Sequence, residues 1–178
     1  EGLASLTTAK LGKTFQEGPG NPLIGLRQRA ELLRRLGQTV SDRPDLFLHD
    51  NESRPGHLLT YLAEEQSLKA RDILRAVLDG LMPIWPSPLR IAGMPLGDVG
   101  LHPSLVRRND TNGIIPFHKL SQWLSYSLIE PLQKFGVNVE NLDGLTGLPE
   151  YRNGGLFVDT GVLNLRDPAA TESAYDPS

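Results

Sequence analysis

The 178-residue sequence contains no cysteine, which excludes disulfides, thiolate nucleophiles and thiolate metal ligands. Aromatic residues make up only 6% of the chain. No apolar run approaches the roughly 20 residues that a membrane helix needs, and no secretion signal opens the chain. The net charge is −3, which gives no general basic surface for nucleic acid. These absences predict a soluble, cytoplasmic globular protein that has neither nucleic acid nor a membrane as its partner.

Familiar catalytic motifs are also missing from the sequence. There is no phosphate-binding glycine loop, no Gly-x-Gly-x-x-Gly, no His-Glu-x-x-His and no Gly-x-Ser-x-Gly. The histidines lack metal-ligand spacing, so we expect neither a metal nor another cofactor. His102 and Asp98 are expected to be structural or surface groups. Carboxylates, assisted by lysine, arginine and aromatic side chains, remain as the groups that can carry chemistry.

The two ends of the sequence indicate a fragment. The chain opens on Glu1 without a methionine and is already in an apolar rhythm, and it closes on the polar segment 168–178. We therefore expect residues 1–178 to form a single helical domain that is part of a longer domain. N-terminal and C-terminal segments of the same protein are then candidate partners that would complete its core.

Helical patterns dominate the first half of the chain. Asn21-Pro22 resembles an N-cap followed by a first-turn proline, and apolar residues then recur at helical spacing, which predicts a helix over 22–36. Further helices are predicted over 55–65 and 68–81, the latter capped by Ser67. The first helix also carries arginines on its outer face. We expect a solvated basic face there, and the alternative is a docking site for a phosphate or an acidic segment.

Residues 83–116 have a different composition. Six prolines and repeated glycines in this segment forbid a long helix and leave short extended pieces such as 89–92. Structured loops of this length are uncommon unless they have a function, so we expect the loop to cover a pocket. The predicted fold class is therefore mostly α, with a long Pro/Gly-rich loop and short strands.

A central helix is predicted over 117–135. Apolar residues at spacings of three and four, from Phe117 to Phe135, predict a buried stripe. Pro131 is expected to kink the helix because it lacks a backbone donor. The neighbouring face carries Lys119, Gln122, Trp123 and Tyr126. It is either the wall of a small-molecule pocket or a pair of core aromatics with polar tips at the surface.

The segment Leu142–Leu163 places charges among glycines and apolar residues. Asp143, Glu150, Arg152 and Asp159 are expected to point inward, where a carboxylate must be paired, hydrogen-bonded or functional. Gly144 to Gly147 and Asn153-Gly154-Gly155 are predicted turns. On this basis the segment is the first candidate for a site.

Three segments of the chain resemble the uracil-catabolism protein 4 family. They are Glu1-Gly-Leu-Ala-Ser-Leu, the run from Pro116 to Leu132, and the run from Leu142 to Leu156. The family is a bacterial and fungal domain of unknown function, linked to a route in which uracil is converted to its ribonucleotide and the ring is opened to a ribosylurea-type intermediate. Its members are about twice as long as this chain, so the resemblance also implies a fragment.

A more distant resemblance is to the queuosine-nucleotide salvage N-glycosylases. It is carried by Lys119-x-x-Gln122 and by Leu145-Thr-x-x-x-Glu150-Tyr-Arg152, where those enzymes usually have aspartate at the position of Glu150. The likeness implies a helical fold resembling the helix-hairpin-helix glycosylases. It also implies hydrolysis of the bond between ribose 5-phosphate and a base.

The resulting hypothesis is an N-ribosyl hydrolase that releases urea from a ribosylurea-type nucleotide. In this hypothesis the catalytic groups are Glu150, Asp143 and Asp159, and the substrate-binding groups are Lys119, Gln122, Trp123, Tyr126, Arg152, Asn153 and His118.

Alternatives remain open for several of these groups. Arg152 is either a phosphate anchor or a structural partner of Glu150 or Asp159, and for Asp143 and Asp159 the pattern favours turn or scaffold residues over catalytic ones. For the whole chain, the alternatives are a non-catalytic helical scaffold for other uracil-degrading enzymes and a hydrolase of the urea moiety.

Overall fold

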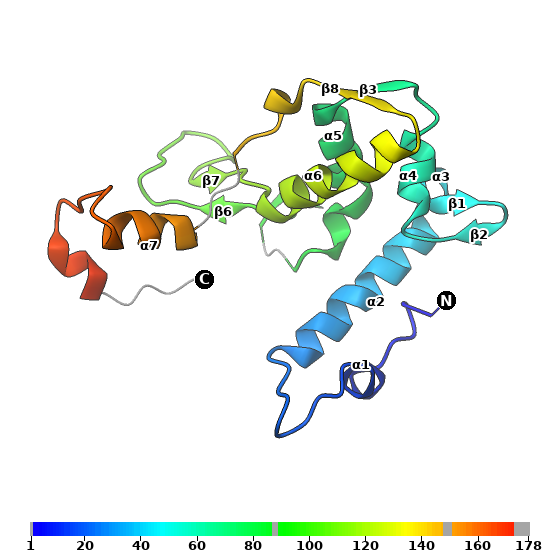
Figure 1. Ribbon diagram of the computed structural model, residues 1–178, viewed down its shortest axis with the longest axis horizontal. Coiled ribbons are helices and arrows are strands. Elements are labelled where there is room, and N and C mark those ends of the chain that lie inside the picture. The colour runs from blue at the N-terminus through cyan, green and yellow to red at the C-terminus, as the bar shows by residue number, and fades with distance from the viewer. Residues whose placement is uncertain (1, 87–88, 148–150, 173–178) are drawn as a thin grey trace. The chain divides into compact units, whose positions relative to one another are not determined.

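The structure, a computed structural model, describes residues 2–86, 89–147 and 151–172 (Figure 1). Internal contacts divide the chain into two compact units, Glu1–Gly147 and Leu148–Ser178. Helices account for about half of the described residues and every described strand is two or three residues long, which confirms a mostly α fold with short strands. The likeness to the helical glycosylase fold stays a prediction. Among the described helices, none combines the length and the hydropathy needed to cross a membrane.

The first unit begins with two helices. Helix α1 (Thr8–Thr14) starts after Thr7, whose hydroxyl oxygen accepts a hydrogen bond from the Lys10 amide at 3.1 Å. Helix α2 (Leu26–Asp42) starts after Gly25, which has a φ of 73°. The helix predicted over 22–36 therefore begins and ends later than expected. The predicted cap at Asn21 is wrong, because its side-chain amide donates back to the carbonyls of Phe15 and Gln16.

A short helix and a hairpin follow α2. Helix α3 (Pro44–Phe47) leads into the antiparallel strands β1 (Leu48–His49) and β2 (Glu52–Ser53). Helix α4 (His57–Leu62) occupies part of the predicted range 55–65. The Phe47 carbonyl accepts the Arg54 amide at 3.0 Å and lies 2.9 Å from Nδ1 of His57, so it ties α3 to the start of α4.

Helix α5 (Ala70–Leu81) confirms the predicted helix over 68–81, apart from its start. Ser67 does not cap it. Instead, Ser67 lies in β3 (Ser67–Lys69), which pairs in parallel with the distant strand β8 (Asn138–Glu140). The apolar residues of α5 recur at spacings of three and four, which buries Ile73, Val77 and Leu81. The helix passes into the 3₁₀ helix η1 (Met82–Ile84) at Pro83.

The Pro/Gly-rich segment contains two small antiparallel ladders in its described part. Strands β4 (Arg90–Ile91) and β5 (Met94–Pro95) form one, and β6 (Gly100–Leu101) and β7 (Ile114–Ile115) form the other. Ala92 and Gly93 connect β4 to β5, with φ values of 49° and 79°. Two successive residues with positive φ are what a tight hairpin turn requires. The short strands predicted in this segment are thus confirmed.

Helix α6 (Lys119–Lys134) matches the predicted central helix closely. Gly136, the residue after the C-cap Phe135, has a φ of 88°. The Gly136 amide donates to Gln133 and the Val137 amide to Leu132, which is the hydrogen-bond pattern of a Schellman motif. The apolar contact that accompanies this motif joins Leu132 and Val137, and both side chains are buried in the core.

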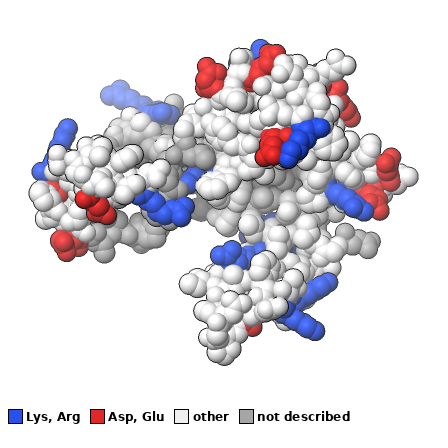
Figure 2. Space-filling view, viewed as in Figure 1, with Lys and Arg blue, Asp and Glu red and all other residues white. Residues whose placement is uncertain are grey.

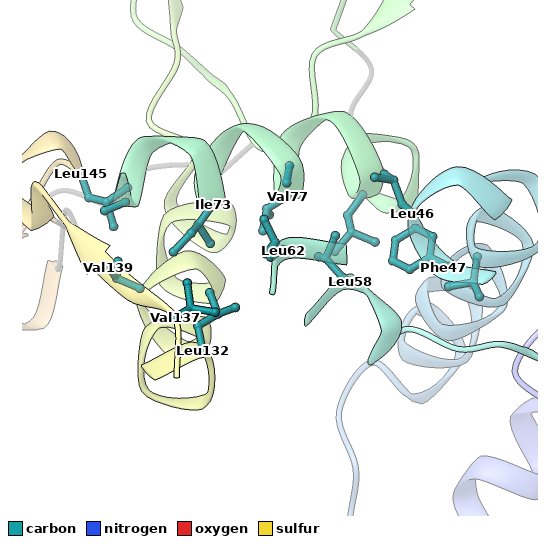
Figure 3. Packing of buried hydrophobic residues seen from close by; sticks show 14 of the residues in the cluster. Leu46, Phe47, Leu58, Leu62, Ile73, Val77, Leu132, Val137, Val139 and Leu145 are labelled. Atoms are coloured by element: carbon teal, nitrogen blue, oxygen red, sulfur yellow. The ribbon is translucent and has the colours of Figure 1, made fainter. Parts of the chain in front are cut away.

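The core of the first unit is arranged along α5 (Figure 3). The labelled side chains run from Leu46 and Phe47 near one end of this helix to Val139 and Leu145 near the other. The apolar stripe predicted on α6 is only partly correct. Leu132 is fully buried, and Leu124 and Leu128 pack against the core, whereas three members are 48%, 49% and 72% exposed: Phe117, Leu120 and Phe135.

The second unit contains helix α7 (Tyr151–Asp159) and the 3₁₀ helix η3 (Pro168–Glu172). The turn predicted at Asn153-Gly154-Gly155 is wrong, because these residues are helical. The polar tail predicted over 168–178 contains η3 in its described part. Residues 173–178 lie outside the described residues.

Gly37 lets the N-terminal segment lie directly against α2. A Cβ at this position would be 2.3 Å from the Ala4 nitrogen and 2.8 Å from Leu3. Alanine is intrinsically better than glycine in a helix by about 1 kcal/mol, but here overpacking dominates. We expect Gly37→Ala to lower the free energy of unfolding by about 1–3 kcal/mol and to expose the N-terminal segment to trypsin.

Urea unfolding and limited proteolysis measure both effects. The control is Gly155→Ala in α7, where no atom lies within 4 Å of the added Cβ. This control should be neutral or slightly stabilising. A Gly37→Ala variant that gained stability to the same extent would show that the N-terminal segment does not pack on α2.

Candidate functional site

The beginning of α6 gathers several polar side chains around Asp98. The residue before the helix, His118, has a φ of 44° and provides no side-chain cap. Asp98 provides the cap instead: one carboxylate oxygen accepts the amides of Leu120 and Ser121 at 2.7 and 3.1 Å, and the other accepts the Ser121 hydroxyl at 2.7 Å. The Asp98 side chain is only 10% exposed, so a nearly buried carboxylate is satisfied by the helix N-terminus.

His118 is held by the same aspartate. Its Nδ1 lies 3.4 Å from Oδ1 of Asp98, and its backbone amide donates to the Asp98 carbonyl at 3.0 Å. The His118 side chain is 17% exposed. A carboxylate facing one ring nitrogen orients an imidazole and leaves the second nitrogen for proton transfer. The contact was not predicted, because 20 residues separate the two partners and no local spacing relates them.

Gln122 lies in the first turns of α6, directly after Ser121. Its residue surface is 5% exposed, and its side-chain oxygen is buried without a hydrogen-bond partner among the described residues. A buried acceptor without a donor is costly in a folded protein, so such groups call for an explanation. A ligand that brings an N–H or O–H donor would satisfy it.

Trp123 and Tyr126 have different surroundings, because only Trp123 lines a groove. Trp123 is 53% exposed and lines a groove of about 640 Å³. Lys119, Gln122 and Tyr126 are not among the residues that line this groove. The Tyr126 hydroxyl donates to the Thr146 carbonyl at 3.3 Å. The four residues predicted to share a pocket wall therefore do not line this groove together.

The expectation that the charges of Leu142–Leu163 point inward is wrong for the described ones. Asp143 lies in the 3₁₀ helix η2 (Leu142–Gly144) of the first unit and is exposed. Arg152, Asn153 and Asp159 lie on α7 of the second unit and are exposed as well. Glu150 lies outside the described residues, and its role stays a prediction. Among the described residues, no three His, Asp or Glu side chains are arranged to hold a metal ion.

A cluster of charged side chains follows one side of α2. Glu31 accepts from Nε of both Arg34 and Arg35 at 3.2 Å, and Arg34 also donates to the Leu6 carbonyl at 2.9 Å. Glu31, Arg34 and Arg35 line a cleft of about 360 Å³ together with Arg27 and Gln28. Hydrogen bonds from Arg34 and then Arg35 hold the pKa of Glu31 below its ordinary value of 4.5.

The lowered pKa of Glu31 gives a prediction with a definite sign. Because the folded-state pKa is depressed, the ion pair stabilises the fold above the unfolded pKa, and this stabilisation is lost as the pH falls through the folded value. We expect the pKa of the Glu31 carboxyl to lie below 4.5 and to rise in Arg34→Gln. NMR titration of the side-chain carboxyl carbons measures this pKa, with the same titration in 1 M salt as the control. An unchanged Glu31 titration in Arg34→Gln would contradict the pairing.

The first unit is a mostly helical body whose α6 starts on an aspartate–histidine pair and flanks an apolar groove. The chain belongs to the family described as "Protein of unknown function (DUF1688)", whose model matches residues 1–177.

Two curated relatives agree with this assignment. The chain is 39% identical over 181 residues to "Uracil catabolism protein 4" of Lachancea kluyveri, covering 94% of this chain and 41% of the relative. It is 40% identical over 178 residues to "Protein urg3" of Schizosaccharomyces pombe, covering 99% of this chain and 41% of the relative. The resemblance to the uracil-catabolism protein 4 family is confirmed, and the chain spans about two fifths of the length of these relatives. No solved structure matches the chain with significance.

Proposed function

We propose that the chain is part of a uracil-catabolism enzyme that hydrolyses the N-ribosyl bond of a ribosylurea-type nucleotide. The proposed role in uracil catabolism rests on the 39% identity, over almost the whole chain, to a relative named for uracil catabolism. The reaction itself is argued from the chemistry of the residues at α6 and from the resemblance of Lys119-x-x-Gln122 to nucleotide N-glycosylases.

The proposed reaction consumes one water and releases urea and ribose 5-phosphate. Water attacks the anomeric carbon, the bond from that carbon to the urea nitrogen breaks, and its electron pair stays on the nitrogen, which takes up a proton. The transition state carries positive charge on the ribose, so a carboxylate beside the sugar stabilises it and can accept the proton of the attacking water. Glu150 is the proposed carboxylate, and Asp143 and Asp159 are the other candidates.

His118 is the proposed acid that protonates the leaving urea nitrogen. The support for this role is the contact between its Nδ1 and Asp98, which orients the ring. Urea is rich in N–H donors, which is what the unpartnered oxygen of Gln122 requires. Lys119 and Arg152 are the candidates for the 5-phosphate, Trp123 and Tyr126 for packing on the ribose or urea, and Asn153 for a further bond to the leaving group.

The decisive assay supplies ribosylurea 5-phosphate to a full-length family protein that contains this sequence. We expect urea and ribose 5-phosphate to appear in equal amounts, in buffers with and without added divalent metal. Glu150→Gln should reduce kcat at least ~100-fold without changing the thermal midpoint. The matched control is Glu140→Gln in β8, an exposed glutamate outside the candidate site.

Two results would count against the proposal. No turnover above buffer in either condition would remove the glycosidase, and the non-catalytic scaffold for other uracil-degrading enzymes would then be the better reading. Unfolding of Glu150→Gln, with retained activity in Glu150→Asp, would instead indicate that Glu150 is a structural partner of a cation.

A further inference from the structure

The groove beside α6 is almost entirely apolar. Its volume is about 640 Å³. It is lined by residues of α2, α4, α5, η1 and α6 and of the loops next to them, most of which are leucines. The lining residues include Leu36, Ile84, Trp85, Leu120, Trp123 and Ser127. The one hydroxyl among them, that of Ser127, already donates to the Trp123 carbonyl at 3.0 Å. Small-molecule pockets usually add convergent polar groups to apolar walls. The other side-chain polar atoms of the lining are the indole N–H groups of Trp85 and Trp123, and a leucine-rich groove with so few polar groups fits the apolar face of a helix.

The groove leaves large apolar side chains in contact with water. Leu120 and Trp123, one turn apart on the outer side of α6, are 49% and 53% exposed. Burial of apolar surface is favourable by roughly 25 cal/mol per Å², so a covering element would gain directly from these two side chains. Leu120 is also one of the three exposed members of the apolar stripe predicted on α6, and the groove accounts for its exposure.

A basic cleft adjoins the groove. This cleft, of about 360 Å³, contains Arg27, Arg34 and Arg35 but only one acidic residue, Glu31. Ile84 lines both the cleft and the groove, and Leu32 in the cleft lies one turn before Leu36 in the groove. The two hollows are therefore neighbours along α2 and η1. The side chain of Arg27 has no hydrogen-bond partner among the described residues, and the guanidinium of Arg35 uses only Nε for Glu31, which leaves donors for an additional carboxylate.

We propose that the groove and the basic cleft together bind one amphipathic helix from the part of the family protein that lies outside this chain. The helix places its apolar face on Leu120, Trp123 and the leucines of the groove, and it places one or more carboxylates in the basic cleft. Two observations select this occupant. The relatives are more than twice as long as the chain, which covers 41% of each, and the excess of arginine in the cleft complements acidic residues.

This inference does not depend on the proposed hydrolase activity. A scaffold and an enzyme would both need the rest of the family protein to cover the same surface. Docking is therefore measured by binding, with no substrate present, and its failure leaves the assay of the proposed function unaffected.

The chain contains its own reporters for the experiment. Both of its tryptophans, Trp85 and Trp123, line the groove. The chain labelled with 5-fluorotryptophan gives two ¹⁹F resonances, which Trp123→Phe assigns. The partner is the part of the Schizosaccharomyces pombe relative outside the matched region, produced as a separate unlabelled polypeptide. We expect both resonances to shift on titration with this polypeptide.

Single substitutions test the groove and the basic cleft independently. Leu120→Asp should weaken binding at least ~10-fold, and Arg27→Glu should weaken it by a smaller factor that shrinks as salt is added. Because both positions lie at the surface, the variants should keep the thermal midpoint of the parent chain. The matched controls are Leu101→Asp and Arg108→Glu, which change an exposed leucine and an exposed arginine outside both hollows and should bind normally.

Three results would overturn the proposal. Unshifted resonances at saturating polypeptide would show that the groove is not covered by this part of the family protein. Binding that survives Leu120→Asp would place the contact elsewhere. Shifts that depend only on the concentration of the chain itself, without the added polypeptide, would assign the groove to a second copy of the chain.

Discussion

Replacing Phe47 with alanine is expected to lower the free energy of unfolding by about 3–5 kcal/mol. Its ring is completely buried and lies against α5, where a Cβ built on Gly80 would be 3.5 Å from Cζ of Phe47. The Phe47 carbonyl, which binds Arg54 and faces His57, is unaffected by the change. The substitution therefore tests ring packing alone, and the cost comes from lost apolar burial and from the cavity left between α3 and α5.

Urea unfolding followed by far-UV circular dichroism measures this loss. The matched control is Phe15→Ala, because Phe15 is 57% exposed and should contribute well under half as much. Equal losses for the two variants would show that α3 does not pack on α5. A second substitution sharpens the test: Gly80→Ala overpacks the parent, with its Cβ 2.9 Å from Leu46, but it should partly fill the cavity of Phe47→Ala.

Removing the Asp98 carboxylate is expected to have the second largest effect. Asp98→Ala deletes three hydrogen bonds to the start of α6 and leaves the Leu120 and Ser121 amides without their acceptor. Hydrogen bonds to a charged group and helix caps each contribute on the order of 1–3 kcal/mol, with overlap. We expect a loss of about 2–3 kcal/mol, and a fall of roughly 5–10 °C in the thermal midpoint.

Amide NMR spectra locate the effect, since the Leu120 and Ser121 signals should move most. Asp98→Asn keeps an acceptor oxygen and should lose less stability than Asp98→Ala. The matched control is Asp110→Ala, an exposed aspartate of the same loop segment, which should be neutral. A neutral Asp98→Ala would mean that the loop does not cap α6, and it would also remove the support for an oriented His118.

Regular periodicity made two of the helices predictable from the sequence. In α5 and α6 the apolar residues recur at helical spacing between clear breakers, and both helices lie within two residues of the predicted ranges 68–81 and 117–135. Caps were predicted less well. Ser67 and Asn21 have side chains suited to capping, but β8 pairs with Ser67, and the Phe15 and Gln16 carbonyls bind Asn21. The strand that pairs with Ser67 is distant in sequence, and the carbonyls that bind Asn21 belong to a loop without a repeating pattern, so local patterns do not reveal either contact.

The candidate site was predictable only in part, for a similar reason. The sequence placed His118, Lys119 and Gln122 at the start of a helix, which is where they lie. It did not reveal that Asp98 from the preceding loop would bind that start. In Leu142–Leu163 the mixture of charges and apolar residues was read as inward-pointing, yet Arg152 and Asp159 lie seven residues apart on an exposed face of α7. In Figure 2 the two signs of charge are interspersed over the visible face, in keeping with solvated ionic residues.

The parallel pairing of β3 with β8 brackets the two central helices, α5 and α6, together with the hairpin segment that connects them. These strands lie directly before α5 and shortly after α6, so they close the whole excursion from Ala70 to Val137 at its base. Longer or shorter hairpins within that excursion would change the entropy of loop closure only slowly with length. We therefore expect insertions in the hairpin segment between α5 and α6 to leave the core folded as long as Asp98 still reaches the start of α6.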